Sequence, residues 1–249
     1  MLKSGVVSVS FRELSAEEVI SITKEAGLSA IEWGSDVHAP ADDIEKIRSI
    51  AKMQRVASLV CSSYGTYFRL GVDSADELPK YIKAAKILGT DVLRLWCGKK
   101  NFDDMSDGEK SFIISESKKA ANIAEREGVT LCMECHRNTF TNSLDGALNL
   151  MSSVNSSAFR MYWQPSTTAE HASNIEYATK IAPYTVNIHV FYYKNGAACP
   201  LEEGLHVWRE YLDCFSPDGY LLLEFMPDKK PTSLKREAES LVKLIKNNI

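Results

Sequence analysis

The chain has 249 residues, of which 45% are hydrophobic and 25% are charged, and its formal net charge at pH 7 is −4. This composition is typical of a soluble globular protein, and an acidic chain supplies no basic field to hold nucleic acid. The sequence shows neither a signal peptide nor an apolar run of about eighteen residues, so we expect a cytoplasmic protein without a membrane partner. We expect a single domain over residues 1–249.

The same order of signals recurs along the chain: a Ser/Thr-x-x-Glu box, an amphipathic run, a glycine and a short apolar segment. Each box predicts a helix start because its side chains satisfy free backbone amides. The boxes are Ser15/Glu18, Ser74/Glu77, Ser106/Glu109 and Thr167/Glu170. Glycine predicts a helix end because it adopts the left-handed turn readily. The glycines in such positions are Gly27, Gly89 and Gly128.

Strands and helices are predicted to alternate strictly along the chain. The predicted strands are 5–10, 29–34, 56–61, 90–97, 129–135, 159–164, 185–190 and 220–225. The predicted helices are 15–26, 41–53, 74–88, 106–127, 143–154, 168–181, 202–213 and 232–247. Alternation predicts an α/β protein with parallel strands. Eight strand–helix units of similar length, without a Gly-x-Gly-x-x-Gly turn, favour a closed (β/α)8 barrel over an open doubly wound sheet.

Alternation within the strands predicts which side chains enter the barrel. Glu32, Arg94 and Trp96 would face inward, and so would Arg160. A buried charge needs a partner, so we expect a carboxylate from Glu32 or Glu134 to pair with an arginine. The candidates for that arginine are Arg94 and Arg160. Such an ion pair can serve the structure or bind substrate.

Four predicted strands in the second half of the chain end on side chains that can bind metal or move a proton. These residues are Glu134, Gln164, His189 and Glu224. They recur at intervals of 25 to 35 residues, the spacing of consecutive strands in a βα barrel, so they can converge on one face. Two carboxylates, an imidazole and a carboxamide form a hard donor set that suits divalent Mn²⁺, Mg²⁺, Co²⁺ or Zn²⁺.

An ion at this point could hold a carbonyl oxygen and a neighbouring hydroxyl of a sugar, and it would stabilise the enediolate formed when the α-proton leaves. Glu134 and Glu224 would act as the catalytic acid and base, because one can remove the proton while the other returns one. Return to the opposite face of the same carbon is epimerisation, and return to the adjacent carbon interconverts an aldose and a ketose. The expected partner is therefore a small carbohydrate.

Five segments, in order, make the chain resemble the xylose-isomerase-like TIM barrel superfamily of sugar phosphate isomerases and epimerases, which also contains endonuclease IV. The segments are GLSAIEWG, TDVLRLW, LCMECH, NIHV and LLLEF. The resemblance covers essentially the whole chain and implies a single (β/α)8 TIM barrel. It also implies a metal-dependent isomerase or epimerase in which Glu134, His189 and Glu224 bind the metal. The two glutamates would carry the protons.

Two positions depart from the family pattern. Gln164 stands where the family usually has a metal-binding Asp, so the site has one negative charge fewer and we expect weaker binding of a divalent ion. Thr167 stands where the family often has a histidine, and its place in a helix-start box explains it without a function. Gln164 therefore stays in the expected ligand set as a weaker donor.

Further candidate substrate contacts lie near the strand ends. They are Glu32, Arg69, Trp96, His136 and Lys194. Arg69 and Lys194 follow the third and seventh strands, and loops of this kind can meet a phosphate. Each candidate has a structural alternative, since aromatic residues in a barrel wall often only pack and loop lysines are often only solvated.

Other chemically active side chains are assigned to packing or to the surface. We expect Trp163 to pack in the barrel wall and His38, His171 and His206 to be surface residues. The six cysteines are expected to be reduced thiols. The single C-x-x-C pair lies in a predicted strand, where its members point to opposite faces and cannot bind one ion together.

Alternative functions remain open. A noncatalytic sugar-binding barrel with a degenerate metal site would explain Gln164 and Thr167. A related enolate-type lyase or isomerase would use the same proton chemistry. A nuclease like endonuclease IV would need further histidines at the ends of the second to fourth strands, and the third and fourth strands end without one. Barrels of this kind often pair, so a homodimer also stays open.

Overall fold

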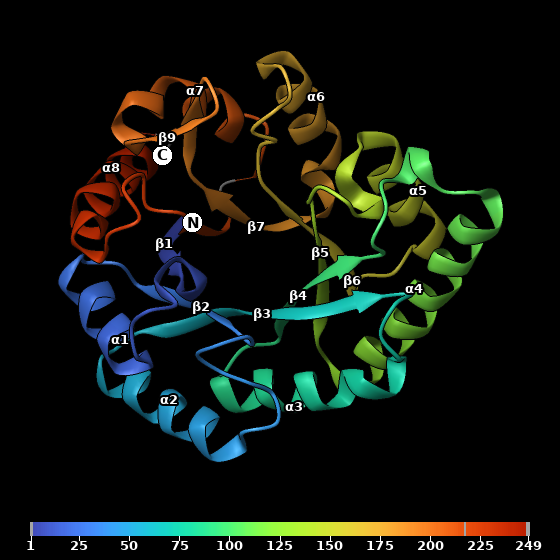
Figure 1. Ribbon diagram of the computed structural model, residues 1–249, viewed down its shortest axis with the longest axis horizontal. Coiled ribbons are helices and arrows are strands. Elements are labelled where there is room, and N and C mark those ends of the chain that lie inside the picture. The colour runs from blue at the N-terminus through green and yellow to red at the C-terminus, as the bar shows by residue number, and fades with distance from the viewer. Residues whose placement is uncertain (1, 217, 248–249) are drawn as a thin grey trace.

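Parallel strands close into a barrel at the centre of the molecule (Figure 1). The computed structural model describes residues 2–216 and 218–247. The barrel strands in these residues are β1 Leu2–Val7, β2 Ala30–Gly34, β3 Val60–Leu70, β4 Val92–Cys97, β5 Thr130–Glu134, β6 Phe159–Trp163, β7 Thr185–Val190 and β10 Gly219–Leu223. Their order is β1-β10-β7-β6-β5-β4-β3-β2, so β1 pairs with both β2 and β10 and the sheet is closed.

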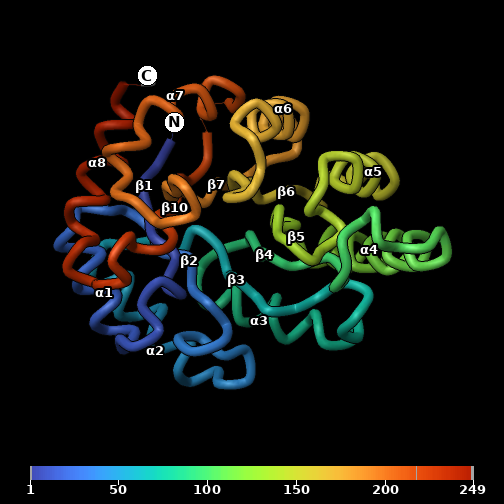
Figure 2. Tube along the Cα trace, turned by 45° about the horizontal axis from the view of Figure 1, so that its top comes forward, coloured from blue at the N-terminus to red at the C-terminus, as the bar shows by residue number. Residues whose placement is uncertain are grey.

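Helices form a ring around the barrel. In the described part of the chain they are α1 Ala16–Glu25, α2 Ile44–Val56, α3 Leu78–Leu88, α4 Asp107–Glu127, α5 Leu144–Val154, α6 His171–Ile181, α7 Leu205–Leu212 and α8 Leu234–Lys246. The last helix, α8, lies beside α1 in Figure 1 and in Figure 2, so the ring closes where the chain ends meet. The predicted (β/α)8 TIM barrel is confirmed.

Local sequence signals set several helix ends. Ser15 and Ser106 start α1 and α4 through capping boxes, in which each serine hydroxyl accepts from the amide three residues later and the glutamate there accepts from the serine amide. Gly89 and Gly128 end α3 and α4 in the left-handed conformation. These ends follow the sequence prediction because each signal satisfies backbone groups within its own turn.

The other two predicted boxes are wrong. Ser74 caps a short 3-10 turn, Ala75–Glu77, and α3 begins only after it. Helix α6 begins at His171 without a capping side chain, because Thr167 lies in an exposed loop that precedes the helix. Helix capping therefore does not explain Thr167.

The third strand lies later than predicted. Residues 56–61 were expected to form it, but α2 continues to Val56 and β3 begins at Val60. With 11 residues, β3 is much longer than its neighbours, and its pairing with β4 is irregular between Gly65 and Arg69. As a result, Arg69 belongs to a strand rather than to a loop.

A hairpin between β7 and α7 was not predicted. Its strands, β8 Tyr192–Lys194 and β9 Ala197–Cys199, pair in antiparallel fashion. Asn195 and Gly196 connect them with φ values of 52° and 76°. A two-residue hairpin turn requires positive φ at both positions, and Asn-Gly is the pair that adopts it most readily.

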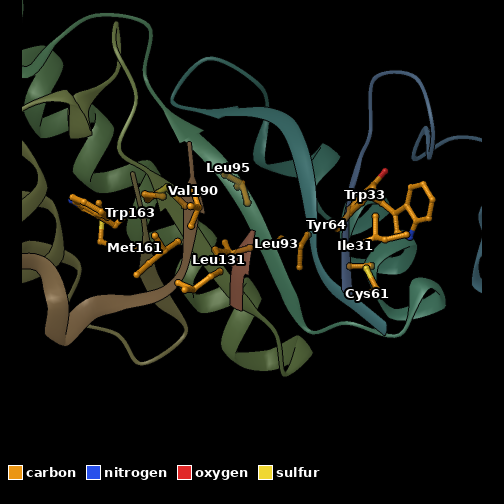
Figure 3. Close-up of a cluster of buried hydrophobic side chains, with 14 of the residues drawn as sticks. Ile31, Trp33, Cys61, Tyr64, Leu93, Leu95, Leu131, Met161, Trp163 and Val190 are labelled. Atoms are coloured by element: carbon orange, nitrogen blue, oxygen red, sulfur yellow. The ribbon is translucent and has the colours of Figure 1, made fainter. Parts of the chain in front are cut away.

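Apolar side chains pack both outside and inside the barrel. Ile31, Trp33, Leu93 and Leu95 lie between the strands and the helices, as strand alternation predicts (Figure 3). The smaller interior cluster is Val7, Val9, Cys132, Tyr162 and Leu222. Residues near strand starts, such as Val92 and Tyr220, pack against it. In the strand register Tyr162 pairs with Glu134 and Leu222 pairs with His189. The interior cluster therefore lies beside the polar side chains that enter the barrel.

The cysteines do not form disulfides within the described residues, as expected. Cys132 belongs to the interior cluster and Cys135 packs against the outer core, so the two members of the C-x-x-C pair lie on opposite sides of the barrel wall. In the part of the chain that the structure describes, no helix combines the length and the apolar composition needed to cross a membrane.

Candidate active site

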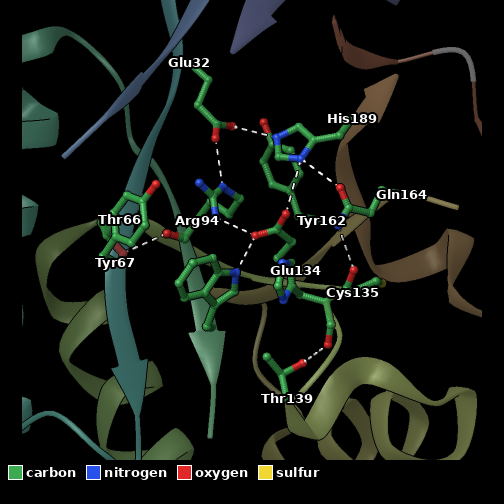
Figure 4. Close-up of polar contacts among 12 residues, drawn as sticks. Glu32, Thr66, Tyr67, Arg94, Glu134, Cys135, Thr139, Tyr162, Gln164 and His189 are labelled. Atoms are coloured by element: carbon green, nitrogen blue, oxygen red, sulfur yellow. Dashed lines mark hydrogen bonds and ion pairs between the residues drawn. The ribbon is translucent and has the colours of Figure 1, made fainter. Parts of the chain in front are cut away.

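The barrel strands bring five chemically active side chains together near their carboxyl ends. They are Glu32 of β2, Arg94 of β4, Glu134 of β5, His189 of β7 and Glu224, which directly follows β10. All five are buried. Figure 4 shows the first four pointing toward one another. The expected convergence of these strand ends is therefore present.

Arg94 joins two of the carboxylates. Its Nε lies 2.8 Å from Glu32 Oε1, and its Nη1 lies 2.5 Å from Glu134 Oε2. The predicted ion pair is thus confirmed for Arg94. Arg160 takes no part in it, because it stands near the start of β6, where its guanidinium donates to the carbonyl of Pro183.

Further polar contacts surround Glu32. Ser63 Oγ donates to Glu32 Oε2 at 2.8 Å, and the Tyr162 hydroxyl lies 3.0 Å from Ser63 Oγ. Gly65 leaves room for the ion pair, since a Cβ there would lie 2.7 Å from Glu32 Oε1 and 2.8 Å from Arg94 Nη2. Sequence reasoning missed Ser63 and Gly65 because it ended the third strand at residue 61.

His189 faces four oxygens. Its Nε2 lies 3.3 Å from Glu32 Oε2. Its Nδ1 lies 3.3 Å from Gln164 Oε1, 3.4 Å from Glu134 Oε1 and 3.5 Å from Glu224 Oε2. These three oxygens and the ring nitrogen form a convergent set of four possible ligand atoms, one from each of four strand ends.

These donors fit a divalent cation. Ligand atoms of Glu134, His189 and Glu224 lie within 4.8 Å of one another, close to the spacing of donors around one ion with bonds of about 2.0–2.3 Å. Glu224 Oε2 is buried and makes no hydrogen bond within the described residues, and its nearest charged neighbour is His189 Nδ1 at 3.5 Å. A buried carboxylate oxygen that lacks a hydrogen bond is unfavourable. Glu32 faces Nε2 of His189, which leaves Nδ1 for the ion.

The two glutamates differ in proton affinity. Burial alone would raise the pKa of Glu134, but the charges of Arg94 and His189 hold that pKa at about 2. Burial raises the pKa of Glu224 to about 7, and the charge of Glu134 contributes to the rise. Burial would lower the pKa of His189, but the carboxylates of Glu224 and Glu32 raise it to about 10. Glu134 is therefore a fixed anion, while Glu224 exchanges a proton near neutral pH.

An aromatic and cationic wall lies against Glu134. Trp96 Nε1 donates to Glu134 Oε2 at 2.6 Å, and the ring centroids of Trp96 and His136 are 5.1 Å apart. The Arg69 guanidinium lies 4.2 Å from the centroid of the Trp96 ring and donates to the carbonyl of Gly98 at 3.1 Å. Three of the predicted substrate contacts therefore lie together beside one catalytic candidate.

Other predicted residues lie apart from this cluster. Lys194 is exposed on β8. Trp163 is buried and packs against Trp208, as expected. The surface assignment of His38 is wrong, because its side chain is buried and its Nε2 lies 3.1 Å from the carbonyl oxygen of Leu14.

A cavity of about 350 Å³ opens beside the cluster. Gln164, His136 and Phe225 are among the residues that line it. This volume falls within the range of small-molecule sites, about 300–1,000 Å³. Of the four expected metal ligands only Gln164 lines this cavity, and its Oε1 contacts His189.

Solved structures share this fold over nearly the whole chain. The probable 3-DHS dehydratase AsbF of Bacillus anthracis, involved in petrobactin synthesis, is 18% identical, with a TM-score of 0.77 over 97% of this chain and 99% of that chain. An L-ribulose 3-epimerase is 16% identical, with a TM-score of 0.76 over 98% of this chain and 94% of that chain. A xylose isomerase-like TIM barrel protein of Mycobacterium smegmatis, in complex with magnesium, is 13% identical, with a TM-score of 0.75 over 99% and 97% of the two chains.

The sequence match identifies the family. No curated protein matches the chain. The family model described as xylose isomerase-like TIM barrel matches residues 20–246. This match covers most of the chain, and the solved structures agree with it in fold. The chain therefore belongs to the xylose isomerase-like TIM barrel family.

Proposed function

We propose that this protein is a metal-dependent isomerase or epimerase that moves a proton at the carbon next to a sugar carbonyl group. The observation that carries the proposal is the convergence of Glu134 and Glu224 on His189 Nδ1, at 3.4 and 3.5 Å. Two carboxylates beside one donor cluster can accept a proton and return one to the same small substrate.

The residues that would hold the ion are Glu134, Gln164, His189 and Glu224. When bound, a divalent ion would polarise the sugar carbonyl and its neighbouring hydroxyl and so make the α-proton more acidic. Arg94 and Trp96 both donate to Oε2 of Glu134, which leaves its Oε1 facing the cluster. Glu134 is thereby held in one orientation as a carboxylate.

Glu224 is the better suited of the two to transfer a proton. In the metal-free protein burial raises its pKa to about 7, whereas the pKa of Glu134 is about 2, so Glu224 takes up a proton far more readily than Glu134. General acid–base catalysis works best when the pKa of the group lies near the working pH. The comparison structures include a protein named as a sugar epimerase and one in complex with magnesium, and both support the proposal.

Solvent deuterium exchange tests the proposal. The metal-loaded protein is incubated in D₂O with a panel of aldoses, ketoses and their phosphates, and deuterium at the carbon next to the carbonyl is measured by mass spectrometry and NMR. We expect exchange with at least one sugar, and loss of that exchange in Glu134→Gln and Glu224→Gln. Glu176→Gln, an exposed change on α6, is the matched control and should exchange normally.

The same experiment separates the alternatives. Loss of water from the sugar, detected as a lower product mass, would indicate a lyase that uses the same proton abstraction. If no sugar in the panel exchanges a proton with metal-loaded protein, the enzyme proposal is wrong.

A noncatalytic sugar-binding barrel is the second candidate. The neutral Gln164 favours it, since one carboxylate fewer weakens the affinity for a divalent ion. Elemental analysis of purified protein distinguishes the two candidates. A stoichiometric divalent ion supports the enzyme, whereas metal-free protein that binds sugar without proton exchange supports the binding barrel.

A further inference from the structure

A second cavity adjoins the active-site cavity. Its volume is about 230 Å³. The residues that line both cavities are Pro165, Ser166, Thr167, Asn174, Phe191 and Tyr193. The loop after β6 and the chain after β7 therefore line both cavities, and the second cavity lies next to the first on the side of α7.

Aromatic rings form much of the second cavity. Tyr192 and Tyr193 line it as half-buried rings together with the exposed His171, and Trp208 and Tyr211 line it as buried rings. The rings of His171 and Tyr211 have centroids 5.1 Å apart, and those of Trp208 and Tyr211 are 5.5 Å apart. Aromatic side chains offer an apolar face and, in tyrosine and tryptophan, a polar tip. This combination suits a sugar ring, which has an apolar C–H face and a polar edge.

The wall is held in place by its own contacts. Asn174 Oδ1 accepts from the Ser166 amide at 2.8 Å, and its Nδ2 donates to the Ser166 carbonyl at 3.1 Å. Trp208 Nε1 donates to the Phe191 carbonyl at 2.8 Å. Gly204 brings the Tyr192 ring close, since a Cβ there would lie 2.4 Å from ring atoms. A site held in this way can bind a ligand with little loss of conformational entropy.

The side chains that line the second cavity favour a neutral ligand. The lining residues include no Asp, Glu, Lys or Arg. A phosphate or carboxylate would therefore have no side chain of opposite charge here, apart from the exposed His171 at the edge. None of the hydrogen bonds within the described residues uses the hydroxyl groups of Thr167, Tyr192 or Tyr193, so these groups are free for a ligand.

We propose that the substrate is a neutral glycoside whose second ring binds in this aromatic cavity while its reacting ring lies beside Gln164. The inference rests on the proposed function and narrows its substrate class from sugars in general to neutral two-ring sugars. It follows from the lining residues that the two cavities share, the aromatic walls and the lack of charged side chains in the second cavity.

Binding measurements with two variants test this subsite. Val207 lines the second cavity on α7 and is half-buried, so Val207→Phe should fill the space. Tyr192→Ala should remove one aromatic wall. Val242→Phe is the matched control, because Val242 is also half-buried on a carboxyl-terminal helix, α8, but lies away from both cavities. Thermal unfolding confirms that each variant is folded.

The probes are glucose, glucose 6-phosphate, maltose, cellobiose and trehalose, measured by isothermal titration calorimetry. We expect at least one disaccharide to bind about tenfold more tightly than glucose, which corresponds to about 1.4 kcal/mol from the further aromatic contact. Val207→Phe and Tyr192→Ala should abolish this advantage without changing glucose affinity, and Val242→Phe should keep it. Equal affinity of the wild type for glucose and every disaccharide would overturn the proposal.

Two further outcomes separate this inference from the proposed function. A disaccharide advantage that survives Val207→Phe, or a preference for glucose 6-phosphate that Val207→Phe removes, contradicts the neutral subsite. Deuterium exchange with monosaccharides and no disaccharide advantage leaves the isomerase proposal intact and removes the subsite. A disaccharide advantage without exchange of any sugar proton supports the subsite and removes the isomerase proposal.

Discussion

Arg94 holds two buried carboxylates in place from one position on β4. It contacts Glu32 through Nε and Glu134 through Nη1, and its side chain is only 4% exposed. Burial alone would lower the pKa of Arg94, but the charges of Glu134 and Glu32 raise it. The guanidinium therefore stays charged, and it keeps both carboxylates ionised around His189.

Replacement of Arg94 by methionine should destabilise the protein by about 3–5 kcal/mol, because it leaves the two carboxylates buried without their partner. Urea unfolding at neutral pH measures the loss. Arg160→Met is the control, since the Arg160 guanidinium donates to the Pro183 carbonyl outside the cluster. This variant should lose about 1 kcal/mol or less of stability. Equal losses for the two variants would show that the ion pair with Arg94 is not important for stability.

Ionised Glu224 lowers the stability of the metal-free protein, whereas Arg94 raises it. Its pKa is raised from 4.5 to about 7 in the folded state. Between these values the folded state binds a proton more tightly than the unfolded state, so stability falls as pH rises through this window and stays lower above it. Glutamine cannot ionise, so Glu224→Gln removes this effect.

Glu224→Gln should therefore be more stable than the wild type at pH 8, by at most about 3 kcal/mol, since a tenfold change in proton affinity corresponds to about 1.4 kcal/mol. The difference should shrink toward zero below about pH 4, where the unfolded state also holds the proton. Urea unfolding in EDTA at pH 5 and pH 8 measures it. A difference that does not depend on pH would contradict the raised pKa.

At the level of elements, β3 determines how closely the charged side chains can pack. Gly65 lies on β3 opposite Arg94 in the strand register, and both side chains of the ion pair approach its Cα. A Cβ at this position would lie less than 3.0 Å from Glu32 Oε1 and from Arg94 Nη2. Only glycine leaves the ion pair in its observed position.

Gly65→Ala should destabilise the protein by about 1–3 kcal/mol, the usual result of overpacking a filled core. Gly108→Ala is the control, because a Cβ at Gly108 meets nothing within 4 Å and Gly108 lies in the first turn of α4. That change should be neutral or slightly stabilising. Thermal unfolding compares the two. A neutral Gly65→Ala would mean that the ion pair shifts without strain.

The same strand shows why the sequence predicted the barrel better than the site. Alternation placed Glu32 and Arg94 inside, and strand spacing brought Glu134 and Glu224 to one end, because both rules depend only on regular geometry. The contacts of Ser63 were missed because nothing in the local sequence marks where β3 begins. A strand boundary depends on tertiary packing more than on propensity.

The adjoining cavity was missed for a related reason. It forms where the loop after β6, the hairpin β8–β9 and α7 meet, and such a meeting point depends on loop conformations that no repeat pattern describes. Asn195 and Gly196 did carry a signal for the hairpin, since this pair favours a two-residue turn. The failure of the predicted Thr167/Glu170 box has a similar cause, because Asn174 fixes the backbone of Ser166 and holds the segment outside the helix.

At the scale of the whole molecule, the barrel interior holds an apolar cluster and a charged cluster side by side. Tyr162 and Leu222 of the apolar cluster pair in the strand register with Glu134 and His189. Three carboxylates, a guanidinium and an imidazole form the charged cluster. A divalent ion can enter this group only if His189 gives up a proton, since a ligating imidazole nitrogen must be unprotonated. Metal binding and proton release are therefore coupled across the site.

Binding of Mn²⁺ should release protons, and its affinity should rise with pH. The pKa values of His189 and Glu224 are raised to about 10 and about 7 in the metal-free protein. Near pH 6 both groups hold protons, so we expect the release of up to about two protons per ion, and of about one at pH 8, where only His189 is protonated. Calorimetric titration in two buffers of different ionisation enthalpy counts these protons.

Mn²⁺ binding to His189→Gln should release about one proton fewer than binding to the wild type. His171→Gln, a change of an exposed histidine, should release as many protons as the wild type. Mn²⁺ binding without proton release at pH 6 would place the ion elsewhere on the molecule, because no ion can bind at Nδ1 of His189 while that nitrogen keeps its proton.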